Sequence, residues 1–196
     1  MESGRLEAFT DGVMAVIITI MVLELKAPHE ASWHALAGSW PIFVSYVLSF
    51  IYVGIYWNNH HHLLHIPQAV NGKILWANLF FLFWISLFPF TTSWLAEAQP
   101  APQPMPTAVY GFVLMMAAIS WIPLLRFLIS ANGGPKGELA DAVRSTWKEY
   151  GSVLIYALAI VVAFFSPIVA CVMYAAVAAI WFIPDRRIEK KVVEES

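Results

Sequence analysis

The sequence predicts an all-α polytopic membrane protein with six transmembrane helices. Of its 196 residues, 60% are apolar and only 12% are charged, whereas soluble domains hold about 45–50% apolar and about 25% charged residues. A chain of this size cannot hide so much apolar surface from water. At about 20 residues per span, six helices use nearly the whole chain, so we expect a single domain over residues 1–196.

The apolar segments follow one another between polar loops. The first four are separate runs, each long enough for a span. The stretch 150–184 is too long for one span, and Ser166-Pro167 is the break signal inside it, because the residue before a proline leaves the helical region. We therefore divide it in two. The expected spans are about 8–25, 35–57, 74–95, 107–125, 150–165 and 167–183.

The loop charges predict the orientation. With six spans, one side of the membrane holds ten of the eleven basic residues and the other side holds only Lys26. Lys and Arg accumulate on the cytoplasmic side, so we expect both termini in the cytoplasm of a multi-pass protein in the cell membrane. The ten are Arg5, Lys73, Arg126, Lys136, Arg144, Lys148, Arg186, Arg187, Lys190 and Lys191.

Several functional classes are disfavoured. The single cysteine, Cys171, excludes an internal disulfide and a cysteine-based zinc site. The formal net charge of −2 gives no sign of nucleic-acid binding. No HExxH, GxSxG or glycine-rich phosphate loop occurs, and the expected spans 3 to 6 carry almost no ionisable side chains. We expect neither an enzyme nor a bound cofactor.

Polar residues gather instead at one membrane depth, the predicted cytoplasmic ends of spans 1, 2 and 3. Asp11 lies inside an apolar run, where an unpaired carboxylate is costly, so it needs a donor. We interpret the group as a polar clamp between the three helices; a further role in gating or as a pH sensor stays open. The candidate residues are Arg5, Thr10, Asp11, His60, His61, His62, Trp76 and Asn78.

The run of three histidines also raises the question of a metal site. Successive helical residues point about 100° apart, so the three cannot bind one ion from one face. His61 and His65, four residues apart, make at most a two-ligand pair. Interfacial hydrogen bonding is the favoured interpretation, and we expect no metal.

Span 1 differs from spans 2 to 4 because its apolar part has no aromatic residue. Val16, Ile20 and Leu23 share one stripe, with Thr19 beside it as the central hydroxyl. Such a smooth aliphatic stripe suits either a symmetry axis or a plain buried packing face, and the residues alone leave both open. A threonine in a span commonly bonds back to the carbonyl four residues earlier, here Ala15.

The sequence resembles the transmembrane protein 175 family, the endolysosomal potassium channels and their bacterial relatives. Residues 5–11 (RLEAFTD) resemble the family signature RxxxFSD, with Thr10 where the family usually has serine, and Phe9 joins the candidate clamp through this motif. The resemblance continues through residues 57–62 (WNNHHH), Asn78 and residues 87–90 (LFPF). It covers roughly the first 95 residues at motif level.

This resemblance implies a potassium-permeable channel without a TVGYG filter, built as a homotetramer with helix 1 of each copy lining the pore. The hydrophobic constriction is implied at Val16, Ile20 and Leu23, and the selectivity layer at Thr19. The lipid bilayer and the other copies are the expected partners, and potassium is the permeant ion. A proton-permeable leak channel and a non-conducting membrane scaffold remain the alternatives.

Overall fold

The computed structural model describes residues 3–28, 30–65, 69–97, 102–137, 139–140 and 146–182. Every regular element in these ranges is helical, so the all-α class is confirmed for this part of the chain. In order, the elements are α1 (Ser3–Leu23), α2 (Trp33–Gly38), α3 (Trp40–His65), α4 (Gly72–Ile85), α5 (Phe88–Glu97), α6 (Pro104–Ala131), the 3-10 turn η1 (Gly134–Lys136), α8 (Thr146–Ala163) and α9 (Pro167–Phe182).

Four helical segments are long and apolar enough to cross a membrane. They are Ser3–Leu23, Trp40–Leu64, Gly72–Glu97 and Pro104–Ala131. The helix Pro167–Phe182 is apolar but shorter. The break predicted at Ser166-Pro167 does separate α8 from α9. The total of six spans therefore stays a prediction, and the basic residues of the C-terminal tail lie outside the described residues.

The second expected span, 35–57, has different bounds in the structure. A short helix, α2, precedes α3, and α3 continues eight residues beyond Trp57, through the histidine run. Hydropathy ends the span too early because these polar residues have partners inside the protein: the Asn59 amide donates to the Ile55 carbonyl at 2.9 Å, and His60 bonds Asn78. Because these polar side chains have hydrogen-bond partners, the helix continues past the last apolar residue.

The third expected span, 74–95, is one apolar segment but two helices. α4 ends at Ile85, and α5 begins at Phe88, just before Pro89. Pro89 has no amide hydrogen to donate to the residue four positions earlier, and its ring crowds that carbonyl, so the helix is interrupted. In contrast, Pro123 stays inside α6, which runs uninterrupted from Pro104 to Ala131. The same residue type therefore breaks one span and is tolerated in another.

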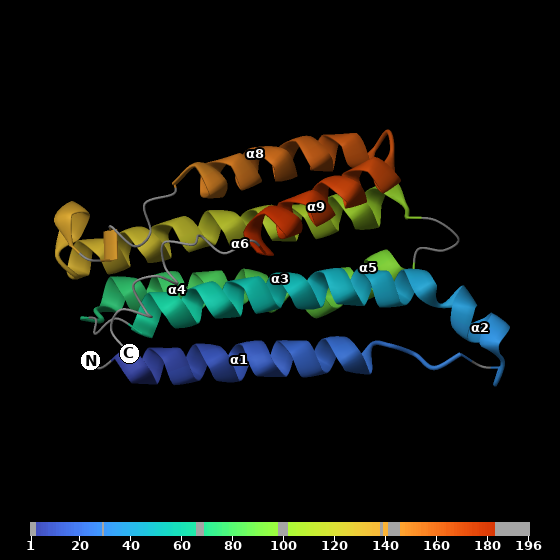
Figure 1. The fold of residues 1–196 in the computed structure, drawn as a ribbon, viewed down its shortest axis with the longest axis horizontal. Coiled ribbons are helices and arrows are strands. Elements are labelled where there is room, and N and C mark those ends of the chain that lie inside the picture. The colour runs from blue at the N-terminus through green and yellow to red at the C-terminus, as the bar shows by residue number, and fades with distance from the viewer. Residues whose placement is uncertain are drawn as a thin grey trace.

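The helices form a bundle in which α1 lies at one edge and α8 at the opposite edge (Figure 1). α6 packs against α4, α5, α8 and α9, whereas α1 packs against α3, α4 and α5. Gly111 allows the close approach of α6 and α9, since a Cβ there would lie 2.0 Å from the Tyr174 hydroxyl oxygen. That hydroxyl donates to the Thr107 carbonyl at 3.2 Å. α1 therefore contacts the rest of the described bundle along only one of its sides.

Candidate pore helix and its polar anchor

One face of α1 is completely packed inside the chain. Its residues recur every three or four positions, which places them on one helical stripe. Met14 is 1% exposed and Ile17 is 3% exposed. The stripe consists of Leu6, Thr10, Met14, Ile17 and Met21, and it faces α3, α4 and α5. These contacts fix the rotation of α1 about its own axis.

The opposite side of α1 is not covered by any described part of this chain. Val16 is 55% exposed, Ile20 is 42% exposed and Leu23 is 80% exposed, and Thr19 is exposed as well. The packing of the buried stripe therefore points the predicted constriction residues and the predicted selectivity residue outward together. In a single copy they enclose no pore; they make a surface that another copy or lipid can cover.

The hydroxyl of Thr19 bonds to its own helix. Its Oγ1 donates to the Val16 carbonyl at 2.8 Å, not to the Ala15 carbonyl that we expected. Threonine in a helix reaches either the third or the fourth preceding carbonyl, depending on χ1, and the structure has the nearer one. The bond uses the one hydroxyl hydrogen, so both oxygen lone pairs remain available as acceptors.

Three helices meet in a buried hydrogen-bonded chain at the end of the bundle where α1 begins. The Asn78 amide nitrogen donates to Thr10 Oγ1 at 2.9 Å, and Asn78 Oδ1 lies 3.1 Å from His60 Nε2. All three side chains have 0% exposure. Because an amide oxygen can only accept, His60 Nε2 is the donor in this bond. Asn78 of α4 thus links α1 to α3 with both ends of its amide.

A second link between α1 and α3 lies beside the first. His61 Nδ1 lies 3.0 Å from Glu7 Oε1, and the Trp57 ring stacks on the His61 ring at 5.7 Å. His62 is exposed, with its ring 5.8 Å from that of His61. Glu7 belongs to the polar start of span 1 in the sequence, but it was not among the predicted clamp residues, and its pairing with His61 was not predicted. The side chain of His65 lies outside the described residues.

The other predicted clamp residues take no part in these two hydrogen-bonded links between helices. Arg5 is exposed and makes no hydrogen bond or ion pair with any described residue. Phe9 is 51% exposed and Trp76 is 75% exposed. Asp11 is half-buried, and its Oδ1 is buried without a hydrogen-bond partner in the described ranges. Within one copy, the motif residues Arg5 and Asp11 therefore have no hydrogen-bond or ion-pair partner among the described side chains.

The C-terminal end of α1 borders a crevice of about 550 Å³ against α5, with Ile20, Glu24, Ser93 and Glu97 among its walls. Ser93 Oγ donates to Glu24 Oε2 at 3.1 Å, and Lys26 Nζ bonds Glu97 Oε1 at 2.7 Å. The Glu97 carboxylate raises the pKa of Lys26. Both bonds hold the chain after α1 against α5, and sequence reasoning had named only Lys26.

A metal centre has no support in the described part of the chain. No group of three or more His, Cys, Asp or Glu side chains comes together there. His61 is paired with Glu7, and His60 is paired with Asn78. Of the histidines that the structure describes at the end of α3, His60 and His61 bond side chains of other helices.

The fold and this site define an integral membrane protein built from apolar helices. A family model described as the endosomal/lysosomal potassium channel TMEM175 matches residues 5–89. A potassium channel of Chryseobacterium sp. (strain P1-3) is 51% identical over 194 residues, covering 99% of this chain and 100% of that protein. The chain belongs to the TMEM175 family, which is a family of channels and not of enzymes.

Two further relatives show how far the similarity extends. The crystal structure of a lysosomal potassium-selective channel TMEM175 homolog from Chamaesiphon minutus has a TM-score of 0.80 with 24% identity, covering 92% of this chain and 96% of that one. The human endosomal/lysosomal proton channel TMEM175 is 33% identical over 81 residues, which cover 35% of this chain and 16% of that protein. The first of these shows the shared fold, and the second shows a short matching segment.

Proposed function

We propose that the chain forms a potassium-permeable channel in which α1 of each copy lines a central pore. The Chryseobacterium relative, matched over its full length, is called a potassium channel. The observation that carries the proposal is the outward face of α1, where Val16, Thr19, Ile20 and Leu23 lie exposed together. Four copies around an axis, as a homotetramer, close this face into a pore.

The chemistry of the exposed faces supports α1 as the pore helix. Along α3, the exposed residues include the bulky aromatics Trp40, Phe43 and Phe50, which suit contact with lipid. The exposed face of α1 beyond Gly12 holds only aliphatic residues, Ala15 and Thr19. Large rings at an axis would fill it completely, whereas aliphatic side chains leave a narrow path that can open and close.

The proposed gate works by excluding water. Rings of four Val16, four Ile20 and four Leu23 side chains offer no hydrogen bonds, so a narrow passage between them empties and stops ions. Opening turns or splays α1 until these side chains withdraw. The buried stripe limits this motion, because Thr10 is held by Asn78 at one end of the helix.

Thr19 is the proposed selectivity residue. Its hydrogen is donated to Val16 O, so the oxygen lone pairs of four hydroxyls remain free to replace part of the hydration shell of a cation. Back-bonding and ion coordination therefore do not compete. A layer of four single oxygens predicts modest discrimination of potassium from sodium.

We further propose six spans with both termini in the cytoplasm. The support is the ten-to-one distribution of basic residues, together with the α8–α9 hairpin on the far side of α6. The clamp end of the bundle, with Thr10, Asn78 and His60, is then the cytoplasmic end.

The decisive experiment measures ion flux through purified protein in liposomes. With no proton gradient, we expect potassium to flow down its own gradient, whether that gradient points into or out of the liposomes. We expect Ile20→Trp to block this flux. The human relative is named a proton channel, so the same liposomes are tested with a proton gradient and no potassium gradient. Current that follows only the proton gradient, or no flux at all, contradicts the proposal; the latter result favours a membrane scaffold.

A further inference from the structure

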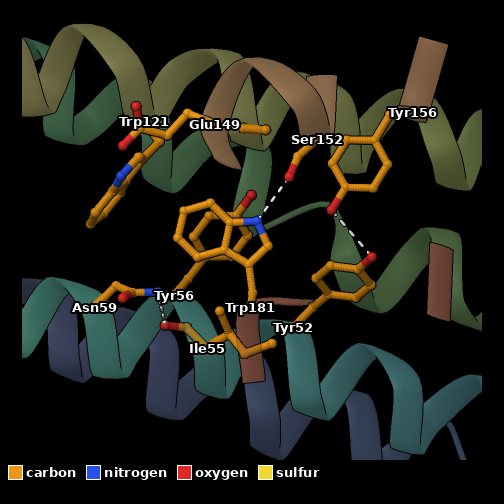
Figure 2. A pocket seen from close by; sticks show the side chains of 10 residues that line it. Tyr52, Ile55, Tyr56, Asn59, Trp121, Glu149, Ser152, Tyr156 and Trp181 are labelled. Atoms are coloured by element: carbon orange, nitrogen blue, oxygen red, sulfur yellow. Dashed lines mark hydrogen bonds between the residues drawn. The ribbon is translucent and has the colours of Figure 1, made fainter. Parts of the chain in front are cut away.

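A small cavity lies between helices of the chain, away from α1. It is enclosed by α3, α6, α8 and α9, and its free volume of about 20 Å³ is the space that one water-sized particle occupies. No residue of α1 lines it. Figure 2 shows its walls, which are Tyr52, Ile55, Tyr56, Asn59, Ala118, Trp121, Glu149, Ser152, Tyr156 and Trp181.

One wall of the cavity carries an acidic residue, Glu149 of α8. Glu149 is 7% exposed, and it makes no hydrogen bond or ion pair with any described residue. Its side chain extends along the cavity wall toward Trp121 (Figure 2). Arg126 donates to the Tyr150 hydroxyl instead. A buried, unpaired charge is costly, so this carboxylate needs a proton or a cation beside it.

The remaining walls offer acceptors and ring faces. The Asn59 amide nitrogen is used by the Ile55 carbonyl at 2.9 Å, which leaves its Oδ1 as an acceptor. The Trp181 indole N–H donates to Ser152 Oγ at 2.8 Å, and Ser152 donates to the Lys148 carbonyl at 2.6 Å. The donors in these bonds are therefore committed within the protein. Trp and Tyr ring faces attract cations, and the Glu149 carboxylate repels an anion, so the charge in the cavity wall favours a cation.

We propose that this cavity binds one water-sized monovalent cation, K⁺ or NH₄⁺, with the Glu149 carboxylate as its counter-charge. The single negative charge of the Glu149 carboxylate balances a monovalent cation but not Ca²⁺ or Mg²⁺, whose protein sites combine several charged and neutral oxygen ligands. The bound cation joins α8 and α9 to α3 and α6. The site is separate from the pore of the proposed function, and its test does not depend on conduction.

The charge state of Glu149 links this site to pH. Glu149 lies one residue before the expected span 150–165, and burial raises its pKa from 4.5 to about 7, against the attraction of Arg126. The other titratable groups near the cavity are Tyr52 and Tyr56 of α3, Tyr156 of α8 and, beyond Trp121, His60 of α3; Arg126 of α6 acts on Glu149 through its charge, and Lys148 is the preceding residue of α8. α9 contributes Trp181 but no titratable side chain to the lining. A proton and the cation therefore compete for one carboxylate.

The test is the thermal unfolding of purified protein in detergent at about pH 8, with KCl or NH₄Cl replaced at constant ionic strength by the chloride of N-methyl-D-glucamine, which is too large for the cavity. At about ten times its dissociation constant, a bound cation raises Tm by about 4 °C. We expect Glu149→Gln, which resembles the protonated acid, to lose this rise. Glu30→Gln, the same change at an exposed position outside the cavity and outside α1, is the matched control and keeps it.

Two results would overturn the proposal: no rise of Tm in the unsubstituted protein, or an equal rise in Glu149→Gln. Should that variant fail to fold, the unsubstituted protein is measured at about pH 5.5. There, protonation of Glu149 lowers the apparent affinity for K⁺ about thirtyfold relative to pH 8. An affinity that is the same at both pH values also contradicts the site. A rise abolished by Thr19→Val but kept by Glu149→Gln places the cation in the pore instead.

Discussion

The two faces of α1 have similar apolar composition but different surroundings. The buried stripe, including Met14 and Ile17, is enclosed by α3, α4 and α5, and its one hydroxyl, Thr10, accepts a hydrogen bond from Asn78. The outward face carries Ile20 and Leu23 at 42% and 80% exposure, and its hydroxyl, Thr19, bonds only to the α1 backbone among described residues.

This difference teaches that the chain completes one face of α1 by itself and leaves the other to an external surface. A hydroxyl with a side-chain partner marks the face that must not move, whereas a hydroxyl bonded back to its own helix marks the face that is free to meet water, ions or another copy. The substitutions below are chosen as pairs, so that each tests one face against the other or against a neutral site.

The largest effect is expected at the anchor of the buried face. Asn78→Leu keeps the volume but leaves Thr10 Oγ1 and His60 Nε2 buried without partners, and each lost bond costs about 1–3 kcal/mol. We expect the free energy of unfolding to fall by about 3 kcal/mol, with a lower Tm and a smaller folded fraction in size-exclusion chromatography.

The matched control is Asn58→Leu, the same change at an exposed position of α3. Exposed substitutions usually alter stability by less than about 0.5 kcal/mol. Equal losses in the two variants would show that the Thr10–Asn78–His60 chain does not hold the helices together.

The second pair separates gating from packing. Ile20→Ala and Leu23→Ala widen the proposed constriction, and we expect basal potassium flux in liposomes to rise about tenfold, because a loss of about 1.4 kcal/mol in the dewetting barrier suffices. Ile17→Ala makes the same kind of truncation on the buried face, where it costs about 2–5 kcal/mol of stability, without raising flux per folded molecule. If Ile17→Ala opens the channel and the outward variants do not, the pore lies on the other face.

The pattern of apolar residues predicted the helical class and the break between α8 and α9, because both follow from local rules. Composition gives the membrane class, and Ser166-Pro167 gives the break. The end of α3 was not predictable in this way. It depends on hydrogen bonds of His60 and His61 to Asn78 and Glu7 on other helices, and a single sequence does not show which distant side chains will meet.

In the candidate site, too, local spacing predicted some features, whereas others depend on contacts between distant residues. The spacing of Val16, Ile20 and Leu23 placed them on one stripe, and the structure places that stripe outward. The spacing of residues does not distinguish an outward stripe from a buried one when both are aliphatic. The rotation of α1 about its axis is determined by the packing of Met14 and Ile17 against other helices. Glu149 escaped notice for a related reason: its burial depends on α3, α6 and α9, and nothing beside it in the sequence signals a cavity.

The smallest and most specific effect is expected at Thr19. Thr19→Val keeps the shape and removes the oxygens that four copies offer to a partly dehydrated cation. A loss of about 1 kcal/mol of differential coordination shifts the potassium-to-sodium permeability ratio about fivefold. Reversal potentials under bi-ionic conditions measure this ratio directly, and stability is expected to change little because the lost bond is a back-bond to the Val16 carbonyl.

Thr10→Val is the matched control on the buried face, since it makes the identical change nine residues earlier. It removes the acceptor of the Asn78 amide, so we expect a lower Tm and an unchanged permeability ratio. An unchanged ratio in Thr19→Val, with current still flowing, would place selectivity in the aliphatic rings. A changed ratio in Thr10→Val would mean that the two faces of α1 are coupled, because the anchor would then set the position of the hydroxyl layer.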